Sequence, residues 1–188
     1  MLRRRSCSRA FGGGFDERRY LDSDRLLMKG QEVMEVAVKQ SAARERTVCQ
    51  YLKDDHKKLD RLLGQILAMV SDNEIERADL HARDLLSGLE HHIRVEEEVL
   101  FPIFEARTLL CAPCEVMRLE HQRIRRLLSE LDDALAKGKG DLATKLLTDL
   151  SQLLEAHNQK EEAVLYPRAD AELSEDERRA VVKMLEER

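Results

Sequence analysis

Tryptophan is absent from this 188-residue chain, aromatic residues make up only 4% of it, and there are three prolines. So few aromatic residues disfavour a β-sheet protein, and so few prolines leave room for long, uninterrupted helices. No apolar run approaches the roughly 18 residues that a membrane-spanning helix requires. Leu, Ala, Glu, Lys and Arg are abundant instead, and these residues favour helices. The composition therefore predicts an all-α protein that does not span a membrane.

The chain also lacks an excess of basic charge. Its 32 Lys and Arg against 37 Asp and Glu give a net charge of −5, which argues against a nucleic-acid partner. The N-terminus is locally basic at Arg3, Arg4 and Arg5, but FGGGFDERRYLD follows where a secretory signal would have an apolar segment. Four cysteines are too few for a disulfide framework. We therefore expect a cytoplasmic protein.

The chain is expected to divide into four parts. Residues 1–22 are basic and glycine-rich and are predicted to be flexible. Residues 23–46 carry a partial apolar stripe and are predicted to be helical. Residues 47–168 carry four long helical patterns, and residues 169–188 a short C-terminal helix. One main domain with appendages suits a chain of this length.

Helix boundaries can be predicted from capping boxes, a first-turn proline and terminal glycines. The predicted helices are one from Thr47-x-x-Gln50 to about residue 70, one from Ser71-x-x-Glu74 to about residue 105, one from Pro113 to near Lys137, one capped by Asp141 to about residue 166, and a short one from Ser174-x-x-Glu177.

The sequence repeats itself at an offset of 65 residues. Residues 56–102 align without a gap on residues 121–167, and 15 of the 47 aligned positions are identical. Because each unit holds two helices, the repeat predicts a helical hairpin used twice. With short connections, it predicts an up-down-up-down four-helix bundle. Six residues of metal-ligating type are among the identical positions: His56 with His121, His92 with His157, and Glu96 with Glu161.

Helical spacing turns these six residues toward the interior. At about 100° per residue, each His shares a helix face with apolar residues. Those residues are Leu59, Leu63, Ile66 and Val70 for His56; Leu85, Leu89 and Val99 for His92; Ile124, Leu128, Leu131 and Leu135 for His121; and Leu150, Leu154 and Val164 for His157. Two of the His lie early in their helices and two lie late, so antiparallel packing brings all four to one end of the bundle. Each Glu follows its His by four residues, on the same face.

Two carboxylates among four inward imidazoles would be costly without a partner, at about several kcal/mol each. A bound metal removes that cost by accepting the lone pairs, and this donor set suits Fe, Mn or Zn. Two carboxylates can bridge a pair of ions, with two His completing each side. A single inward His–Glu pair could be a buried ion pair. Six such residues from four helices favour a binuclear metal site.

The sequence around these residues resembles the hemerythrin-like, or HHE cation-binding, family. The resemblance covers about residues 47 to 168, and its motifs are His56 in DDHKKLDRLL, His92-x3-Glu96 before VLFP, His121 in LEHQRIRRLL and His157-x3-Glu161 before VLYP. It implies a non-haem di-iron centre, with bridging carboxylates and an oxo or hydroxo bridge between two Fe ions, in preference to Mn or Zn.

One position departs from oxygen-carrying hemerythrins. Those proteins have a fifth His one turn before the third-helix His, where this chain has Met117. The remaining set is similar to that of bacterial proteins that repair iron centres after nitrosative or oxidative damage, and to eukaryotic iron-sensing hemerythrin domains. Five ligands on each iron would leave a sixth position open on both, which favours reaction with O2 or NO over simple carriage.

Four polar residues near the predicted ligands are interpreted separately. His91 is expected on the surface, and His81 in the core or at the end of the bundle. Glu97 and Glu162 also repeat. Hydrogen bonds to the ligand His are one interpretation of them, and solvated acids at a helix flank are the preferred one.

Cys111-Ala-Pro-Cys114 is expected in the turn between the second and third helices, at the same end as the metal site. A single Cys-x-x-Cys lacks the partner pair of a zinc ribbon, so a redox-sensitive dithiol is the better functional interpretation. Incidental thiols in a reducing cell are the alternative.

Three functions share these ligands: an enzyme-like di-iron protein, a sensor acting through a protein partner, and a simple iron- or oxygen-binding protein. The expected small-molecule ligand is O2 or NO. Residues 1–46 lie outside the region that resembles the hemerythrin-like family. This N-terminal segment is a candidate for binding a second copy of the chain or a protein partner.

Overall fold

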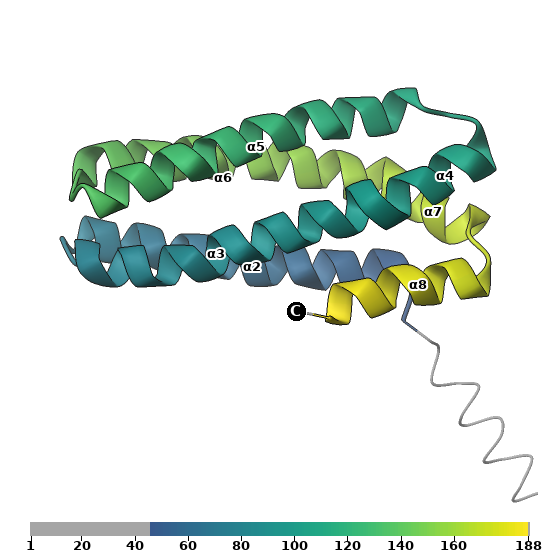
Figure 1. Cartoon of the computed structure of the whole chain (residues 1–188), viewed down its shortest axis with the longest axis horizontal. Coiled ribbons are helices and arrows are strands. Elements are labelled where there is room, and N and C mark those ends of the chain that lie inside the picture. The colour runs from purple at the N-terminus through teal and green to yellow at the C-terminus, as the bar shows by residue number, and fades with distance from the viewer. Residues whose placement is uncertain (1–45, 188) are drawn as a thin grey trace, which may run out of the picture. The chain divides into compact units, whose positions relative to one another are not determined.

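The computed structural model describes residues 46–187, and every regular element in that range is helical (Figure 1). The predictions for residues 1–22 and for residues 23–45 lie outside the described residues. None of the described helices is long and apolar enough to cross a membrane.

Four long helices form an antiparallel bundle. Helix α2 packs on α3 and α5 packs on α6, while α3 also packs on α5 and α2 on α6, so each helix contacts two neighbours (Figure 1). The prediction of an all-α helical bundle is confirmed. The bounds of these helices are α2 Val48–Ser71, α3 Ile75–Val95, α5 Ala112–Ala136 and α6 Gly140–Lys160.

Two of the predicted capping boxes are present and one is not. Thr47 caps α2 with Gln50, and Ser174 caps the C-terminal helix α8 (Glu175–Glu186). The box predicted at Ser71 is wrong, because Ser71 is the last residue of α2 and its hydroxyl donates to the carbonyl of Leu67 at 2.8 Å. The tight turn that follows satisfies the carboxyl end of α2, since its N–H groups donate back to α2 carbonyls.

Helix α6 begins one residue before the predicted cap. Lys139 is its N-cap and Asp141 lies in its first turn. The negative charge of Asp141 therefore interacts favourably with the positive end of the helix dipole, but Asp141 does not cap the helix. The preceding turn depends on Gly138, whose φ of 65° lies in the left-handed region that glycine adopts most easily.

Helices α3 and α6 each widen into a π-helical turn at their carboxyl end. The N–H of Tyr166 donates to the carbonyl of Glu161, five residues earlier, and the first repeat has the same turn. Pro102 and Pro167 account for both turns, because a proline has no N–H to donate and its ring clashes with the carbonyl one turn back. The segments are η1 Glu96–Leu100, α4 Phe101–Thr108, η2 Glu161–Leu165 and α7 Tyr166–Glu172.

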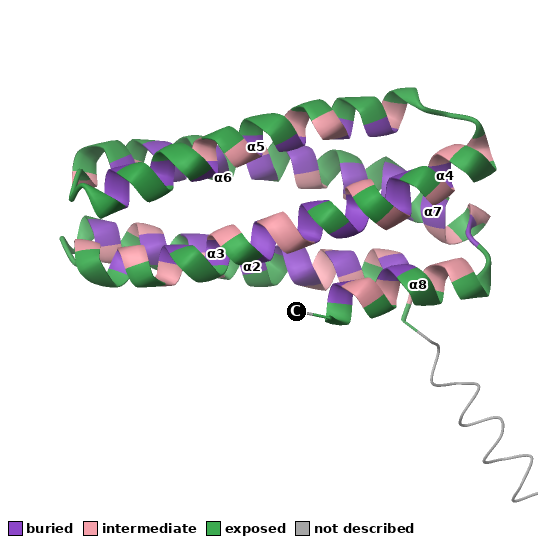
Figure 2. Cartoon of the chain, in the orientation of Figure 1, coloured by how far each residue is buried: buried purple, intermediate pink, exposed green. Residues whose placement is uncertain are grey.

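The π turns change which residues face the core. Val99 and Val164 were predicted inside, yet Val164 is 65% exposed and Val99 is half-buried. The next residues along the chain, Leu100 and Leu165, are buried instead. A π turn holds an extra residue, so the α-helical period no longer predicts the inward positions beyond it. The buried stripes of the helices are visible in Figure 2.

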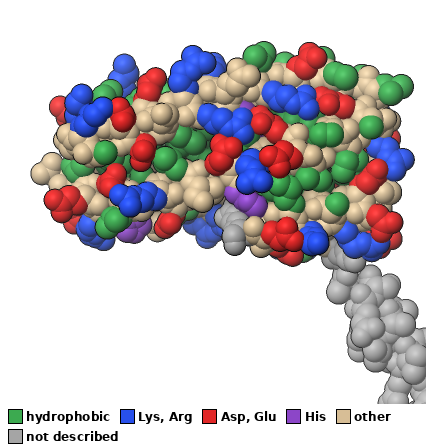
Figure 3. All heavy atoms as spheres, viewed as in Figure 1, with side chains coloured by type: hydrophobic (Ala, Val, Ile, Leu, Met, Phe, Trp, Pro, Cys, Tyr) green, Lys and Arg blue, Asp and Glu red, His purple; other side chains and the backbone are tan. Residues whose placement is uncertain are grey.

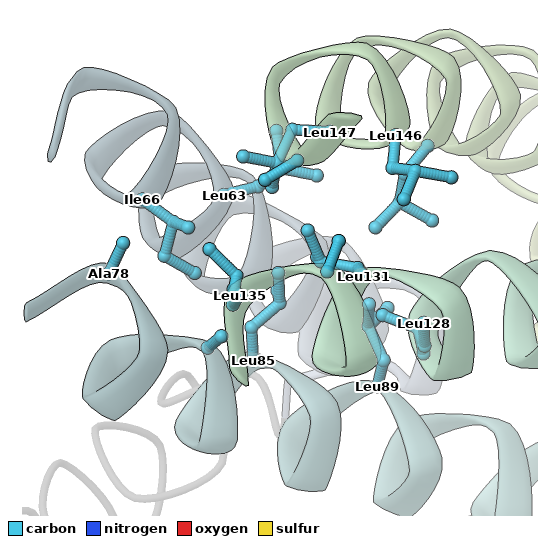
Figure 4. Close-up of a cluster of buried hydrophobic side chains, with 14 of the residues drawn as sticks. Leu63, Ile66, Ala78, Leu85, Leu89, Leu128, Leu131, Leu135, Leu146 and Leu147 are labelled. Carbon is cyan, nitrogen blue, oxygen red and sulfur yellow. The ribbon is translucent and has the colours of Figure 1, made fainter. Parts of the chain in front are cut away.

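Apolar side chains fill the bundle in two clusters. The distal cluster lies away from the π turns and includes Leu59, Leu85, Leu89, Ile124, Leu131 and Leu150. Figure 4 shows part of this cluster. The proximal cluster lies beside the π turns and includes Leu52, Phe101, Cys114, Met117, Tyr166 and Val181. On the face shown in Figure 3, acidic and basic side chains are interspersed. Every apolar residue that was predicted to share a face with a ligand-type His is buried, except Val99 and Val164.

Helix α8 covers one side of the proximal cluster. Val181 and Leu185 bury their side chains there, and α8 packs on α2, α3 and η1 (Figure 1). His91 lies under this helix, where its Nε2 is 3.3 Å from the carbonyl oxygen of Leu185. His91 is therefore half-buried and not the free surface residue expected from its sequence position.

Candidate metal centre

Six buried residues meet between the distal and proximal clusters. The potential ligand atoms fall into two groups, each with its atoms within 4.8 Å of one another, and Glu161 belongs to both. These are the six residues that the repeat identified: His56 on α2, His92 on α3, Glu96 at the start of η1, His121 on α5, His157 on α6 and Glu161 at the start of η2.

The four imidazoles form two pairs. The Nε2 atoms of His56 and His92 are 3.1 Å apart, and those of His121 and His157 are also 3.1 Å apart. Two nitrogens bound to one ion at right angles, with bonds of about 2.1 Å, are about 3.0 Å apart. Each pair is thus spaced as two neighbouring ligands of one ion. We call these the first position (His56 and His92) and the second position (His121 and His157).

The two carboxylates lie between the positions. One oxygen of Glu161 is 3.4 Å from Nε2 of His56 and the other is 3.1 Å from Nε2 of His157. Glu96 Oε2 lies 3.6 Å from Nε2 of His92 and 3.3 Å from Nε2 of His121. Both carboxylates therefore face one imidazole of each pair, as carboxylates that bridge two ions must.

A separate carboxylate orients each imidazole from behind. Every Nδ1 atom donates a hydrogen bond to an acid, which directs Nε2 and its lone pair into the site. The four bonds are His56 to Glu162 at 2.9 Å, His92 to Asp55 at 3.0 Å, His121 to Glu97 at 2.8 Å and His157 to Glu120 at 2.9 Å.

The orienting acids are themselves paired with cations at the surface. Arg125 binds Glu97 through two hydrogen bonds, of 3.0 and 3.1 Å, and also binds Glu90. Lys160 pairs with Glu120. Lys53 lies 3.6 Å from Glu162 and Lys58 lies 4.0 Å from Asp55. These contacts connect each imidazole to a surface cation through one carboxylate.

Only part of this arrangement was predicted from the sequence. Glu97 and Glu162 were interpreted preferentially as solvated acids, and their bonds to His121 and His56 correct that interpretation. Asp55 and Glu120 were missed. The repeat held the signal, because an acid directly precedes the ligand-type His of α2 and the ligand-type His of α5.

Two buried oxygens test whether a metal fits the site. Glu96 Oε2 and Glu161 Oε1 are enclosed and have no hydrogen-bond partner among the described residues. A buried carboxylate oxygen without a partner costs about 1–3 kcal/mol or more. Both atoms point to the imidazole Nε2 atoms, so a cation bound between them would satisfy both oxygens. The donor set fits a metal.

Protons partly replace that cation in the metal-free chain. Burial opposes charge on His56 and His121, but the neighbouring glutamates outweigh it and raise both pKa values to about 9. Burial would also raise the pKa of Glu161, yet contacts with His157 and His56 hold it well below its usual range. The site is therefore built to hold positive charge among its carboxylates.

Tyr166 belongs to the site and was missed by sequence analysis. Its hydroxyl lies 2.6 Å from Glu96 Oε1 and 2.9 Å from Glu161 Oε2, and it is fully buried. In an α-helix, residues five apart point about 140° away from each other. The π turn brings Tyr166 back to the face of Glu161. No signal from regular helical spacing could have found it.

A small cavity of about 10 Å³ adjoins the imidazoles on the side of the distal cluster, which is room for about one water-sized molecule. His56, His92 and His157 contribute to its wall, together with Leu59, Ile93 and Ile124. The centre is therefore bordered by apolar side chains on its distal side.

Other titratable residues singled out in the sequence lie elsewhere. His81 is only half-buried, near the start of α3, and its Nδ1 bonds the carbonyl of Arg77 on the same helix; of its two predicted places, the core is wrong and the end of the bundle stays a prediction. Cys111 is exposed at the start of α5, whereas burial in the proximal cluster raises the pKa of Cys114 to about 12. None of the described cysteines forms a disulfide. The redox role of the pair stays a prediction.

Comparison with known proteins supports the metal interpretation independently. The family model for the hemerythrin HHE cation binding domain matches residues 47–169, which is more than half of the chain. No curated protein and no solved structure gives a significant match. The matched range contains all six potential ligands and the four acids that orient the imidazoles. The chain belongs to the hemerythrin HHE cation-binding family.

Proposed function

We propose that this protein holds a non-haem di-iron centre that reacts with O2 or NO, in a cytoplasmic response to oxidative or nitrosative stress or in the repair of damaged iron centres. One observation carries the proposal. Two pairs of imidazole Nε2 atoms, each 3.1 Å apart, flank two carboxylates whose buried oxygens Glu96 Oε2 and Glu161 Oε1 lack partners.

The donor set favours iron for this role. Imidazole and carboxylate together suit Fe, Mn and Zn, and the described ligand groups contain no thiolate, which a structural zinc site would commonly use. A bound di-iron centre would supply the redox chemistry that no side chain of this site provides. We expect His56 and His92 to hold one ion, His121 and His157 the other, and Glu96 and Glu161 to bridge them.

The surrounding residues would prepare the centre for a small, uncharged ligand. The orienting acids fix the imidazole tautomers, so that metal binding requires no rearrangement of the ligands. The cavity beside His56 and His157 has room for about one small molecule, and Leu59, Leu89, Ile93, Ile124 and Leu154 form the apolar half of its wall. Larger or charged ligands would have to displace core side chains.

Metal loading and gas binding test this function directly. Full-length protein purified without oxygen is analysed for metal, and its optical spectrum is recorded before and after addition of NO or O2. The proposal predicts bound iron and a spectral change with at least one gas. Bound iron with no response to either gas would leave an iron-binding protein and would refute the reactivity.

A sensor is the second candidate function. Cys114 lies in the same apolar cluster as Phe101 and Tyr166, and Cys111 is exposed three residues away. A change of iron state could therefore reach the α4–α5 turn, and a partner bound through the N-terminal segment could read it. Oligomeric state or partner binding that differs between iron-loaded and iron-free protein would favour this candidate. An unchanged assembly would exclude it.

A further inference from the structure

We propose that the hydroxyl oxygen of Tyr166 is an additional metal ligand at the first position, and that only the second position keeps a place for an external molecule. This inference rests on the proposed di-iron function and deepens it. The sequence led us to expect an open coordination position on both ions. Here the centre is asymmetric, with an open position on one ion only.

The position of the hydroxyl oxygen carries the inference. It lies 2.6 Å from Glu96 Oε1, 2.9 Å from Glu161 Oε2, 3.2 Å from Nε2 of His56 and 3.4 Å from Nε2 of His92. Neighbouring ligands of an octahedral ion with bonds of about 2.1 Å are about 3.0 Å apart. Tyr166 therefore stands beside four other donor atoms at the spacing of one further ligand of the same ion.

The backbone holds this oxygen in place. Tyr166 begins α7 directly after the π turn, and its N–H donates to the carbonyl of Glu161. Pro167 follows and favours that turn. The ring is fully buried in the proximal cluster, so the side chain has no exposed alternative. The phenol is fixed toward the first position before any metal binds.

The second position has no such oxygen. In the repeat, Phe101 is the counterpart of Tyr166, and its ring stacks on His121 with centroids 5.8 Å apart and planes 9° from parallel. All six ligand-type residues and the acidic character of the four orienting residues are kept between the repeats. The pair Tyr166 and Phe101 therefore breaks the symmetry of the site, by one oxygen atom.

This asymmetry assigns different roles to the two positions. At the first, coordination would replace the hydrogen bonds that Tyr166 now shares between two carboxylates, and the hydroxyl proton would leave to the buffer. At the second, the Phe101 ring offers an apolar wall and no donor. The second position would then be the one with a free coordination site, and His157, one of its two imidazoles, lines the small cavity on the distal side.

The test compares the full-length protein with three variants, Tyr166→Phe, Phe101→Tyr and Tyr51→Phe. Tyr51 is a matched control, because it is half-buried against the same cluster and its ring contacts Arg46 at the surface. Each metal-free protein is loaded with ferrous iron without oxygen and then oxidised with ferricyanide. Iron content, the visible spectrum and resonance Raman spectra are recorded, with ring-deuterated tyrosine to identify phenolate vibrations.

The inference predicts a phenolate-to-iron absorption band with tyrosine vibrations in the wild type and in Tyr51→Phe, and its loss in Tyr166→Phe at unchanged iron content. Phe101→Tyr should strengthen the band. Iron bound without phenolate vibrations in the wild type would overturn this inference alone and would leave Tyr166 as a hydrogen-bond donor to the carboxylates. Failure of the wild type to bind iron would overturn the proposed function as well.

Discussion

Glu161 and Tyr166 are joined twice, once through the backbone and once through their side chains. The N–H of Tyr166 donates to the carbonyl of Glu161, and its hydroxyl lies 2.9 Å from a carboxylate oxygen of the same residue. Both contacts depend on the π turn between them. The turn thus links the geometry of the carboxylate that we propose as a bridge to the end of the bundle that α8 covers.

The π turn predicts an unusual pattern of core sensitivity. Leu165→Ala should lower the free energy of unfolding by about 2–5 kcal/mol, because Leu165 is buried. Val164→Ala should change it by less than about 0.5 kcal/mol, because Val164 is 65% exposed. Urea unfolding of the two variants measures both. Equal destabilisation, or a larger effect at Val164, would indicate a regular α-helix and contradict the turn.

The orienting acids should control metal affinity without binding metal. Glu97→Gln removes the carboxylate that accepts the hydrogen bond from Nδ1 of His121, and we expect about 10–100-fold weaker metal binding. The matched control is Glu98→Gln, because the adjacent Glu98 is exposed and pairs with Arg94 at the surface. Competition with a chelator measures both affinities. Equal affinities of the two variants would show that Glu97 has no such role.

The raised pKa values of His56 and His121 predict how stability depends on pH in the metal-free protein. Their pKa values rise from 6.5 to about 9 on folding. The stabilisation is complete below 6.5, the pKa of the imidazoles in the unfolded chain, and it is lost as the pH rises through about 9, their pKa in the folded chain. Chelator-treated protein should therefore lose stability between about pH 6.5 and about pH 9, by up to about 3 kcal/mol for each imidazole.

Urea unfolding of the chelator-treated protein across that range measures this loss. The same two groups must release protons before they can bind metal, so metal affinity should increase over the same range. Stability of the metal-free protein that increases from neutral pH to about pH 9 would have the wrong sign for imidazolium groups held by carboxylates.

How much could be read from the sequence depends on the helical period. Helices α2 and α3 keep the α-helical period as far as His92. Residue spacing alone therefore predicts which side chains face the core and that the ligand-type His lie at the same end of the bundle. Beyond Glu96 and Glu161 the period changes. The exposure of Val164 and the inward position of Tyr166 then depend on a backbone turn that apolar patterning does not reveal.

Residue spacing within one helix does not identify the acids behind the imidazoles, although the repeat places an acid directly before both His56 and His121. Asp55 and Glu120 are two among 37 acidic residues in a highly charged chain, and few of the acids between residues 46 and 187 are buried. Their contacts cross between helices, from Asp55 on α2 to His92 on α3, for example. Such contacts depend on the axial offset between neighbouring helices, and residue spacing within each helix does not determine that offset.

Metal analysis of the full-length protein and of His92→Ala, each purified without oxygen, tests the central claim most directly. His81→Ala is the matched control, because His81 lies on the same helix and its Nδ1 bonds the backbone carbonyl of Arg77, away from the site. Two ion positions sharing Glu161 predict about two iron ions per chain in the wild type and in His81→Ala, with a large loss in His92→Ala. Iron content that is negligible in all three proteins, or equal in wild type and His92→Ala, would contradict the binuclear centre.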